Sequence, residues 1–227
     1  MVDGILGLGR GGHSFSDISL RHFDGKFSYC LVDHLSASEV KNYLIFGPAP
    51  ASDSSMTYAT LVANELNVPL YGVQVTGISV GGVMLDIPPM VWNLESRGRT
   101  ILDSGTSLTM LPTPAYRPVV GALMDSLKGF QRAQDEDLEF CFYVDKGFKE
   151  DSMPKLVWHF ADSVKFEPPV KSYIIIGNFH NTNCLGFMEI PWPGVSIIGN
   201  IMQQEHLWEF DYNTGRVGFR PTTCVSD

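Results

Sequence analysis

Short apolar runs separated by glycine and proline constrain the fold of this chain most strongly. The sequence holds 22 glycines and 14 prolines in 227 residues, which favours β-structure broken by turns over a helical bundle. The runs are rich in Val, Ile, Phe and Tyr, which are typical of strands. At 44% hydrophobic, the chain can bury a real core, as one large domain or one and a half ordinary ones. Expected strands cover 26–32, 43–46, 56–61, 70–80, 100–102, 156–160, 173–176, 184–190, 195–198, 207–212 and 216–219.

Two turns and one helix are expected within this mainly β pattern. Gly81-Gly82 follows an alternating run and predicts a tight hairpin, and Asn213-Thr-Gly215 predicts a second. After Pro112, apolar residues recur at helical spacing as far as Leu127. Pro118 is unfavourable inside a helix, so the helix is expected to begin either at Thr113-Pro114 or near Pro118. Its apolar face comprises Tyr116, Val119, Val120, Leu123, Met124 and Leu127.

Acidic residues outnumber basic ones. The chain carries 25 Asp and Glu against 16 Lys and Arg, a formal net charge of -9. Nucleic acids and anionic membranes bind clustered Lys and Arg, so neither is expected as a main partner. No apolar run is long enough to cross a bilayer, and no targeting signal follows Met1. The acidic cluster at 135–139 is expected to be a solvated loop without chemistry.

The cysteines bear on metal binding and on the cellular compartment. Cys30, Cys141, Cys184 and Cys224 are widely spaced, with no Cys-x-x-Cys pair and no histidine at metal-ligand spacing, so no metal site is expected. An even number fits two disulfides and a secretory or vacuolar route. Four buried thiols in a cytosolic protein would give the same count.

Two other motifs are weak. Gly7-Leu-Gly-Arg-Gly-Gly12 has the spacing of a dinucleotide-binding loop, but only Ile5-Leu6 precedes it and no long helical pattern follows. Ser14 and Ser104 lack the Gly-x-Ser-x-Gly elbow of serine hydrolases. The sequence therefore predicts no cofactor and no serine nucleophile.

One carboxylate stands in a tight turn between two apolar runs. An Asp-Ser-Gly turn such as Asp103–Gly105 is by itself most often an ordinary cap of backbone N–H groups. Here Ile101-Leu102 forms a short buried strand that leads to the turn, and Thr106 is placed to hydrogen-bond across to an equivalent loop. Far downstream, Ser196-Ile-Ile-Gly199 supplies two apolar residues and a glycine that would let a strand pass close behind the turn. Such a scaffold would hold the carboxylate rigidly.

At this point the chain resembles the pepsin-like aspartic proteases, and within them the plant nepenthesin-like branch, from end to end. The motifs that carry the resemblance are Gly4-Ile-Leu-Gly-Leu-Gly-Arg-Gly11, Phe27-Ser-Tyr-Cys-Leu31, Ile101-Leu-Asp-Ser-Gly-Thr-Ser107, Leu111-Pro with Ala115-Tyr116, Cys184-Leu-Gly-Phe187, Ile198-Gly-Asn-Ile-Met-Gln-Gln204 and Arg216-Val-Gly-Phe-Arg-Pro221 ending at Cys224. The implied fold is a pepsin-like acid protease lobe, the C-terminal half of a bilobal fold, with one or two short helices.

The resemblance also implies roles for particular residues. Asp103 would be the catalytic aspartate of the C-terminal lobe, in an active-site loop with Ser104, Gly105 and Thr106, and Thr106 would grip the opposite loop. Threading of this loop would fall to Ile197, Ile198 and Gly199. The family pattern would pair Cys141 with Cys184 and Cys30 with Cys224. It would also place the protein on the secretory route, extracellular or vacuolar.

Family members have two lobes, each with one Asp-Thr/Ser-Gly turn, and this chain has no second one. Gly4-Ile-Leu-Gly7 resembles the apolar segment at the end of the first lobe, so residues 1–25 are expected to be its tail and 26–227 the C-terminal lobe. The chain would be a fragment, a truncated gene product or one chain of a cleaved enzyme. Its expected partners are a protein or peptide substrate and either the missing lobe or a second copy.

Two functions follow from this resemblance. The first is one half of an acid-active aspartic endopeptidase that works once a first lobe or a dimer partner is supplied. The second is a catalytically silent binding or inhibitor-like module with the same fold. The intact Asp103 turn favours the first, because a pure binder has no physical need for a carboxylate there. The absence of a first lobe favours the second for this chain by itself.

Overall fold

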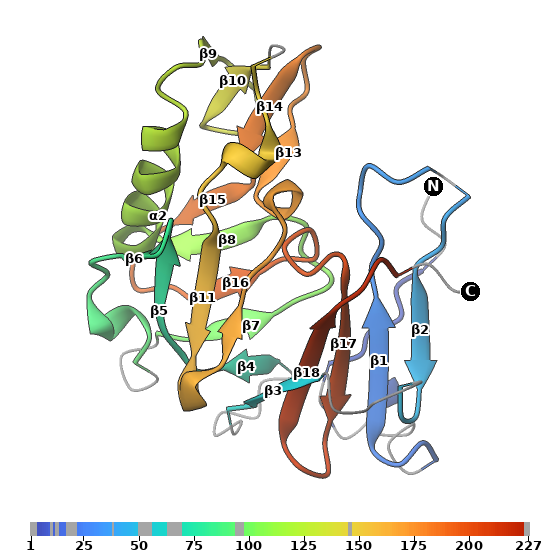
Figure 1. The fold of residues 1–227 in the computed structure, drawn as a ribbon. Coiled ribbons are helices and arrows are strands. Elements are labelled where there is room, and N and C mark those ends of the chain that lie inside the picture. The colour runs from blue at the N-terminus through green and yellow to red at the C-terminus, as the bar shows by residue number, and fades with distance from the viewer. Residues whose placement is uncertain are drawn as a thin grey trace. The chain divides into compact units, whose positions relative to one another are not determined.

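The structure, a computed structural model, describes residues 4–9, 11, 14–16, 22–37, 39–49, 56–62, 70–93, 98–144 and 147–224. The chain divides into two compact units, Met1–Gln74 with Glu205–Asp227, and Val75–Gln204. Strands dominate both units (Figure 1). The predicted mainly β fold is confirmed.

The first unit contains an antiparallel sheet that joins early and late parts of the chain. Its strands are β1 (Lys26–Cys30), β2 (Tyr43–Phe46), β3 (Thr57–Thr60), β4 (Tyr71–Val73), β17 (His206–Asp211) and β18 (Arg216–Pro221). In the sheet the order is β2-β1-β17-β18-β3. The predicted hairpin at Asn213–Gly215 is confirmed: β17 pairs with β18, and Gly215 at the turn has a φ of +63°.

Aromatic stacking and a disulfide hold β1 against the C-terminal strands. Phe27 of β1 stacks on Phe210 of β17 with ring centroids 4.8 Å apart. Cys30, at the end of β1, is bonded to Cys224, which follows β18. Both cysteines are buried. The core of this unit is therefore built from segments nearly 200 residues apart, with a sequence separation of 194 across the disulfide.

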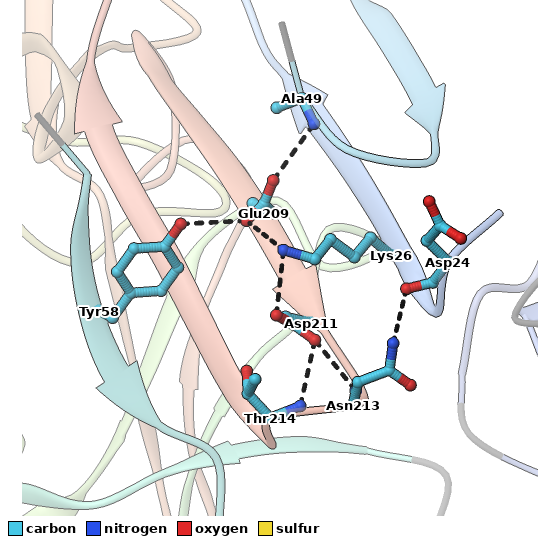
Figure 2. A network of polar contacts seen from close by, with 8 residues as sticks. All are labelled: Asp24, Lys26, Ala49, Tyr58, Glu209, Asp211, Asn213 and Thr214. Carbon is cyan, nitrogen blue, oxygen red and sulfur yellow. Dashed lines mark hydrogen bonds and ion pairs between the residues drawn. The ribbon is translucent and has the colours of Figure 1, made fainter. Parts of the chain in front are cut away.

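A buried ion cluster also crosses this sheet (Figure 2). Glu209 is fully buried, and its carboxylate accepts hydrogen bonds from the Tyr58 hydroxyl at 3.1 Å and the Ala49 N–H at 3.2 Å. The Lys26 ammonium lies 3.5 Å from the Glu209 carboxylate and 3.0 Å from that of Asp211. One cation is therefore shared by two buried carboxylates.

The pKa shifts in this cluster favour its charged form. Burial by itself would lower the pKa of Lys26, but Asp211 and Glu209 raise it above the ordinary value. Burial would raise the pKa of Asp211, but hydrogen bonds from Lys26 and Thr214 lower it. Asp211 contributes stability that is present above its unfolded pKa and lost as the pH falls, whereas the Lys26 contribution is lost as the pH rises through its raised pKa.

We expect Lys26→Met to lower the free energy of unfolding by about 3 to 5 kcal/mol at neutral pH, because it leaves two buried carboxylates without their cation. The loss should shrink in acid, where those carboxylates take up protons. Urea unfolding at neutral and acidic pH measures both effects, with the exposed Lys41→Met as control. An equal loss at both pH values would contradict this explanation.

The second unit carries the strands that position Asp103. Its strands are β5 (Val75–Val80), β6 (Val83–Met84), β7 (Thr100–Leu102), β8 (Thr109–Pro112), β9 (Arg132–Ala133), β10 (Cys141–Tyr143), β11 (Leu156–Phe160), β12 (Lys165–Phe166), β13 (Ile174–Ile176), β14 (Thr182–Leu185), β15 (Phe187–Ile190) and β16 (Ser196–Ile198). Within this unit the sheet orders are β12-β11-β5-β6, β13-β14-β10-β9 and β15-β8-β16-β7. Its short 3₁₀ helices are η1 (Pro89–Val91), η3 (Glu150–Ser152), η4 (Ala161–Ser163) and η5 (Val170–Ser172). The predicted Gly81-Gly82 hairpin is confirmed, since β5 pairs with β6 and both glycines have positive φ.

The helix α2 (Thr113–Ser126) begins earlier than one of the two predicted starts. Its N-cap is Pro112 and Pro118 lies inside it, so the alternative of a start near Pro118 is wrong. Pro118 removes one backbone hydrogen bond. Burial of Ala115 and Tyr116 in the preceding turn, as α2 packs on β8 and β15, outweighs that loss.

A histidine of the second unit is held neutral within a sheet. The Ser79 hydroxyl of β5 and His159 Nε2 of β11 lie 2.8 Å apart. Burial, together with the charge of Lys165, lowers the pKa of His159. The unfolded chain therefore binds this proton more readily than the folded one. The stability that His159 contributes is present above its unfolded pKa and lost as the pH falls below it.

We expect His159→Gln to make the protein relatively more stable in acid than at neutral pH, when compared with the parent. Glutamine still hydrogen-bonds Ser79 but takes up no proton. Urea unfolding of both proteins above and below the unfolded pKa of histidine tests this, with the exposed His180→Gln as control. A pH dependence identical to that of the parent would show that protonation of His159 costs nothing in the fold.

Candidate active site

The Asp103 loop connects β7 to β8. All three residues of β7 are buried, whereas Ser104 and Gly105 are exposed and Asp103 is half-buried. The Asp103 N–H continues the strand by donating to the Ile198 carbonyl at 3.1 Å. The carboxylate accepts the Gly105 N–H at 2.8 Å and the Thr106 hydroxyl at 2.6 Å. The loop therefore holds a solvent-accessible carboxylate with one bond on each oxygen.

The strand β16 passes between the two strands that the loop connects (Figure 1). It is parallel to β7, with Ile198 opposite Leu102, and antiparallel to β8, with Ile197 opposite Met110. A Cβ atom on Gly199 would lie 2.3 Å from the carbonyl oxygen of Leu108. Only glycine allows the backbone to pass this close behind the loop.

Two amides hold the threaded segment in place. The Asn200 N–H donates to the Thr106 carbonyl at 2.7 Å, and its side chain donates to the Ser104 carbonyl at 3.1 Å. The buried Gln203 side chain donates to the Ile198 carbonyl at 2.8 Å. The sequence analysis assigned neither residue to the site. The available signal was two amides directly after an apolar pair and glycine.

Both disulfides join the pairs that the resemblance implies. Cys30–Cys224 lies in the first unit and Cys141–Cys184 in the second. Leu108 and Ile201, which flank the loop and the threaded segment, pack against the cluster around Cys141–Cys184. The second disulfide therefore supports the site from behind.

The remaining sequence features add no chemistry to this loop. Asp135 lies near Cys141 and Cys184 with three potential ligand atoms within 4.8 Å of one another, but the two sulfurs are bonded to each other. The described residues 4–9 form no strand, which a dinucleotide loop would need, and Arg10 and Gly12 lie outside the described residues. Over the described ranges, no helix is long and apolar enough to span a membrane.

This threaded loop with a carboxylate at its tip, in a mainly β lobe, defines a class of protein. The solved structures of edgp and of basic 7S globulin from soybean share the fold, with TM-scores of 0.83 and 0.78 over 97% and 96% of this chain, at 22% and 21% identity. The chain covers 60% and 56% of those two structures. It is a pepsin-like lobe.

The family follows from sequence. A family model described as xylanase inhibitor C-terminal matches residues 70–221, and the chain belongs to this family, as a C-terminal lobe of the plant pepsin-like aspartic proteases. It is 36% identical to Aspartyl protease family protein 2 of Arabidopsis thaliana over 98% of this chain and 46% of that protein. It is 32% identical to aspartic proteinase nepenthesin-2 of Nepenthes gracilis over 97% of this chain and 50% of that protein. The chain thus spans about half the length of these relatives.

Proposed function

We propose that this chain supplies one of the two catalytic aspartates, Asp103, of an aspartic endopeptidase that cleaves protein or peptide substrates. The main support is the threaded loop, which presents a half-buried carboxylate with one hydrogen bond on each oxygen. Ser104, Gly105 and Thr106 complete the loop, while Ile197, Ile198 and Gly199 thread behind it. A rigid carboxylate at a solvent-accessible turn suits proton transfer to and from water.

The proposed reaction needs a second carboxylate. Two facing carboxylates share one proton, because like charges about 3 Å apart do not both ionise. One takes a proton from a bound water, which attacks the peptide carbonyl, while the other protonates the carbonyl oxygen, and the leaving nitrogen is protonated later. Asp103 fills one of these roles. In this chain the Thr106 hydroxyl donates to Asp103, and its contact with an opposite loop remains a prediction.

The second carboxylate would come from a first lobe or from a second copy of the chain. Residues 1–25 would be the tail of that first lobe, with 26–227 as the C-terminal lobe. Ile5 and Leu6 are 93% and 56% exposed, as expected for an apolar segment without the lobe it would support. Two disulfides and the plant aspartic protease relatives point to a secretory or extracellular compartment.

A catalytically silent binding module is the second candidate. The matched family is described as xylanase inhibitor C-terminal, and a soybean basic 7S globulin shares the fold. These names belong to the relatives. An intact Asp103 with its two hydrogen bonds is the observation that separates the candidates, since binding alone does not require it.

Reconstitution tests the proposal. The first half of Aspartyl protease family protein 2 is joined ahead of this chain, and cleavage of a peptide is followed at acidic pH beside the chain alone. We expect cleavage by the joined protein, blocked by a transition-state mimic whose hydroxyl lies between two carboxylates. A folded but inactive joined protein would favour the binding module. Activity of the chain alone, rising with the square of its concentration, would identify a second copy as the partner.

A further inference from the structure

An apolar pocket lies in the second unit between the end of α2 and the strands β9 and β10. Its volume is about 250 Å³. The apolar part of its lining comprises Met124, Leu127, Phe130, Phe140 and Phe142. An apolar cavity of roughly 150 Å³ is enough to hold benzene. This pocket therefore has room for an aromatic ring with a short side chain.

The aromatic wall of the pocket is held by its own packing. Phe130 and Phe142 have ring centroids 5.6 Å apart, and Phe148 lies 5.7 and 5.5 Å from them. The neighbouring Cys141 is tied to β14 by its disulfide with Cys184. A wall of interlocked rings on a cross-linked strand is preformed, so a ligand would not have to order it.

Two cations, Lys128 and Arg132, line the same pocket. Lys128 pairs with Asp125 at 2.9 Å, and both side chains are exposed. Arg132 forms no ion pair with any carboxylate in the described part of the chain. Its guanidinium carbon lies 4.7 Å from the centre of the Phe140 ring, and one N–H donates to the Glu139 carbonyl at 3.2 Å.

The nearby acidic side chains are directed to other partners. The Glu139 carboxylate accepts the Tyr116 hydroxyl at 2.8 Å, and Asp135 and Asp137 both accept from Asn178. Arg132 has five N–H donors, and its described contacts are the Glu139 carbonyl and the Met124 sulfur. In a chain of net charge -9, an arginine held over an aromatic pocket without a carboxylate partner is complementary to an anion.

We propose that this pocket binds a small aromatic monocarboxylate. The ring lies among Phe130, Phe140 and Phe142, and the carboxylate accepts hydrogen bonds from Arg132. The site is independent of the Asp103 loop, so the proposal does not rest on protease activity.

Calorimetric titration of the 227-residue chain with 3-phenylpropionate tests the proposal. We expect saturable binding of one molecule per chain with a Kd on the order of 1 mM or tighter, given the size of the ligand. The neutral amide of the same shape, 3-phenylpropanamide, should bind about tenfold more weakly, because it lacks the charge that Arg132 recognises.

Three variants locate the site. Arg132→Gln should weaken binding of 3-phenylpropionate about tenfold, whereas the control Arg117→Gln, at an exposed arginine of α2, should leave the Kd unchanged. Met124→Trp should fill the pocket and abolish binding while the near-ultraviolet circular dichroism shows a folded chain. Absence of saturable binding, equal affinity for acid and amide, or equal effects of the two arginine variants would overturn the proposal.

Discussion

Asparagine at position 103 should lower peptide cleavage by the completed two-lobed protein by roughly 10²- to 10⁴-fold, the range of a proton-transfer contribution. The amide oxygen can still accept the Gly105 N–H, which bonds the Asp103 carboxylate at 2.8 Å, so the loop should keep its shape. What the amide no longer does is exchange a proton with water or substrate. The measurement is kcat/KM for a peptide substrate at acidic pH, with thermal unfolding recorded for both proteins.

Asp86→Asn is the matched control, because Asp86 is an exposed carboxylate of the same unit, and it should leave cleavage unchanged. Thr106→Val removes the hydroxyl that donates to Asp103 at 2.6 Å but keeps both proton-exchanging groups, so its loss of activity should be smaller. If Asp103→Asn cleaved as fast as the parent, Asp103 would be an ordinary turn residue and the protease proposal would fail.

Removal of the Cys30–Cys224 disulfide should lower the free energy of unfolding by about 5 kcal/mol, the upper figure that loop-closure entropy gives for so long a loop. The two cysteines are 194 residues apart in sequence. Alanine at both positions leaves the unfolded chain free of this constraint, and the first unit also loses the link between β1 and the segment after β18. Guanidinium unfolding of the double variant measures the cost.

The Cys141–Cys184 disulfide is a matched control, because it is equally buried but spans only 43 residues. The same model gives about 4 kcal/mol for its removal, roughly 1 kcal/mol less than for the longer loop. If the shorter loop cost as much or more, packing around the sulfurs, and not loop length, would decide the stability.

Local pattern predicted much of the fold. The strands at 43–46, 100–102 and 156–160 are observed with the predicted ends, and the Gly81-Gly82 hairpin is where two glycines permit positive φ. These features depend on backbone preferences and on side-chain alternation within a few residues. The apolar face of the helix was predictable for the same reason, because helical spacing is also a local property.

Strand partners were not predictable in this way. The run 70–80 alternates throughout, yet the structure divides it into β4 and β5 at Gln74. The run 184–190 is likewise split at Gly186 into β14 and β15, which pair with different strands. Alternation records which residues face a core, but it does not record where a strand leaves one neighbour for another.

The sequence by itself determined the candidate carboxylate, because Asp103, its turn and the apolar pair with Gly199 are recognisable as motifs. Only the tertiary structure decided that Asn200 and Gln203 brace the loop, since an amide carries no periodic signal and Asn200 contacts Ser104 from 96 residues away. The same holds for the pocket at Arg132, whose walls come from a helix end and two strands. Such sites depend on which side chains meet after folding, and that follows from packing of the whole unit rather than from any short stretch of chain.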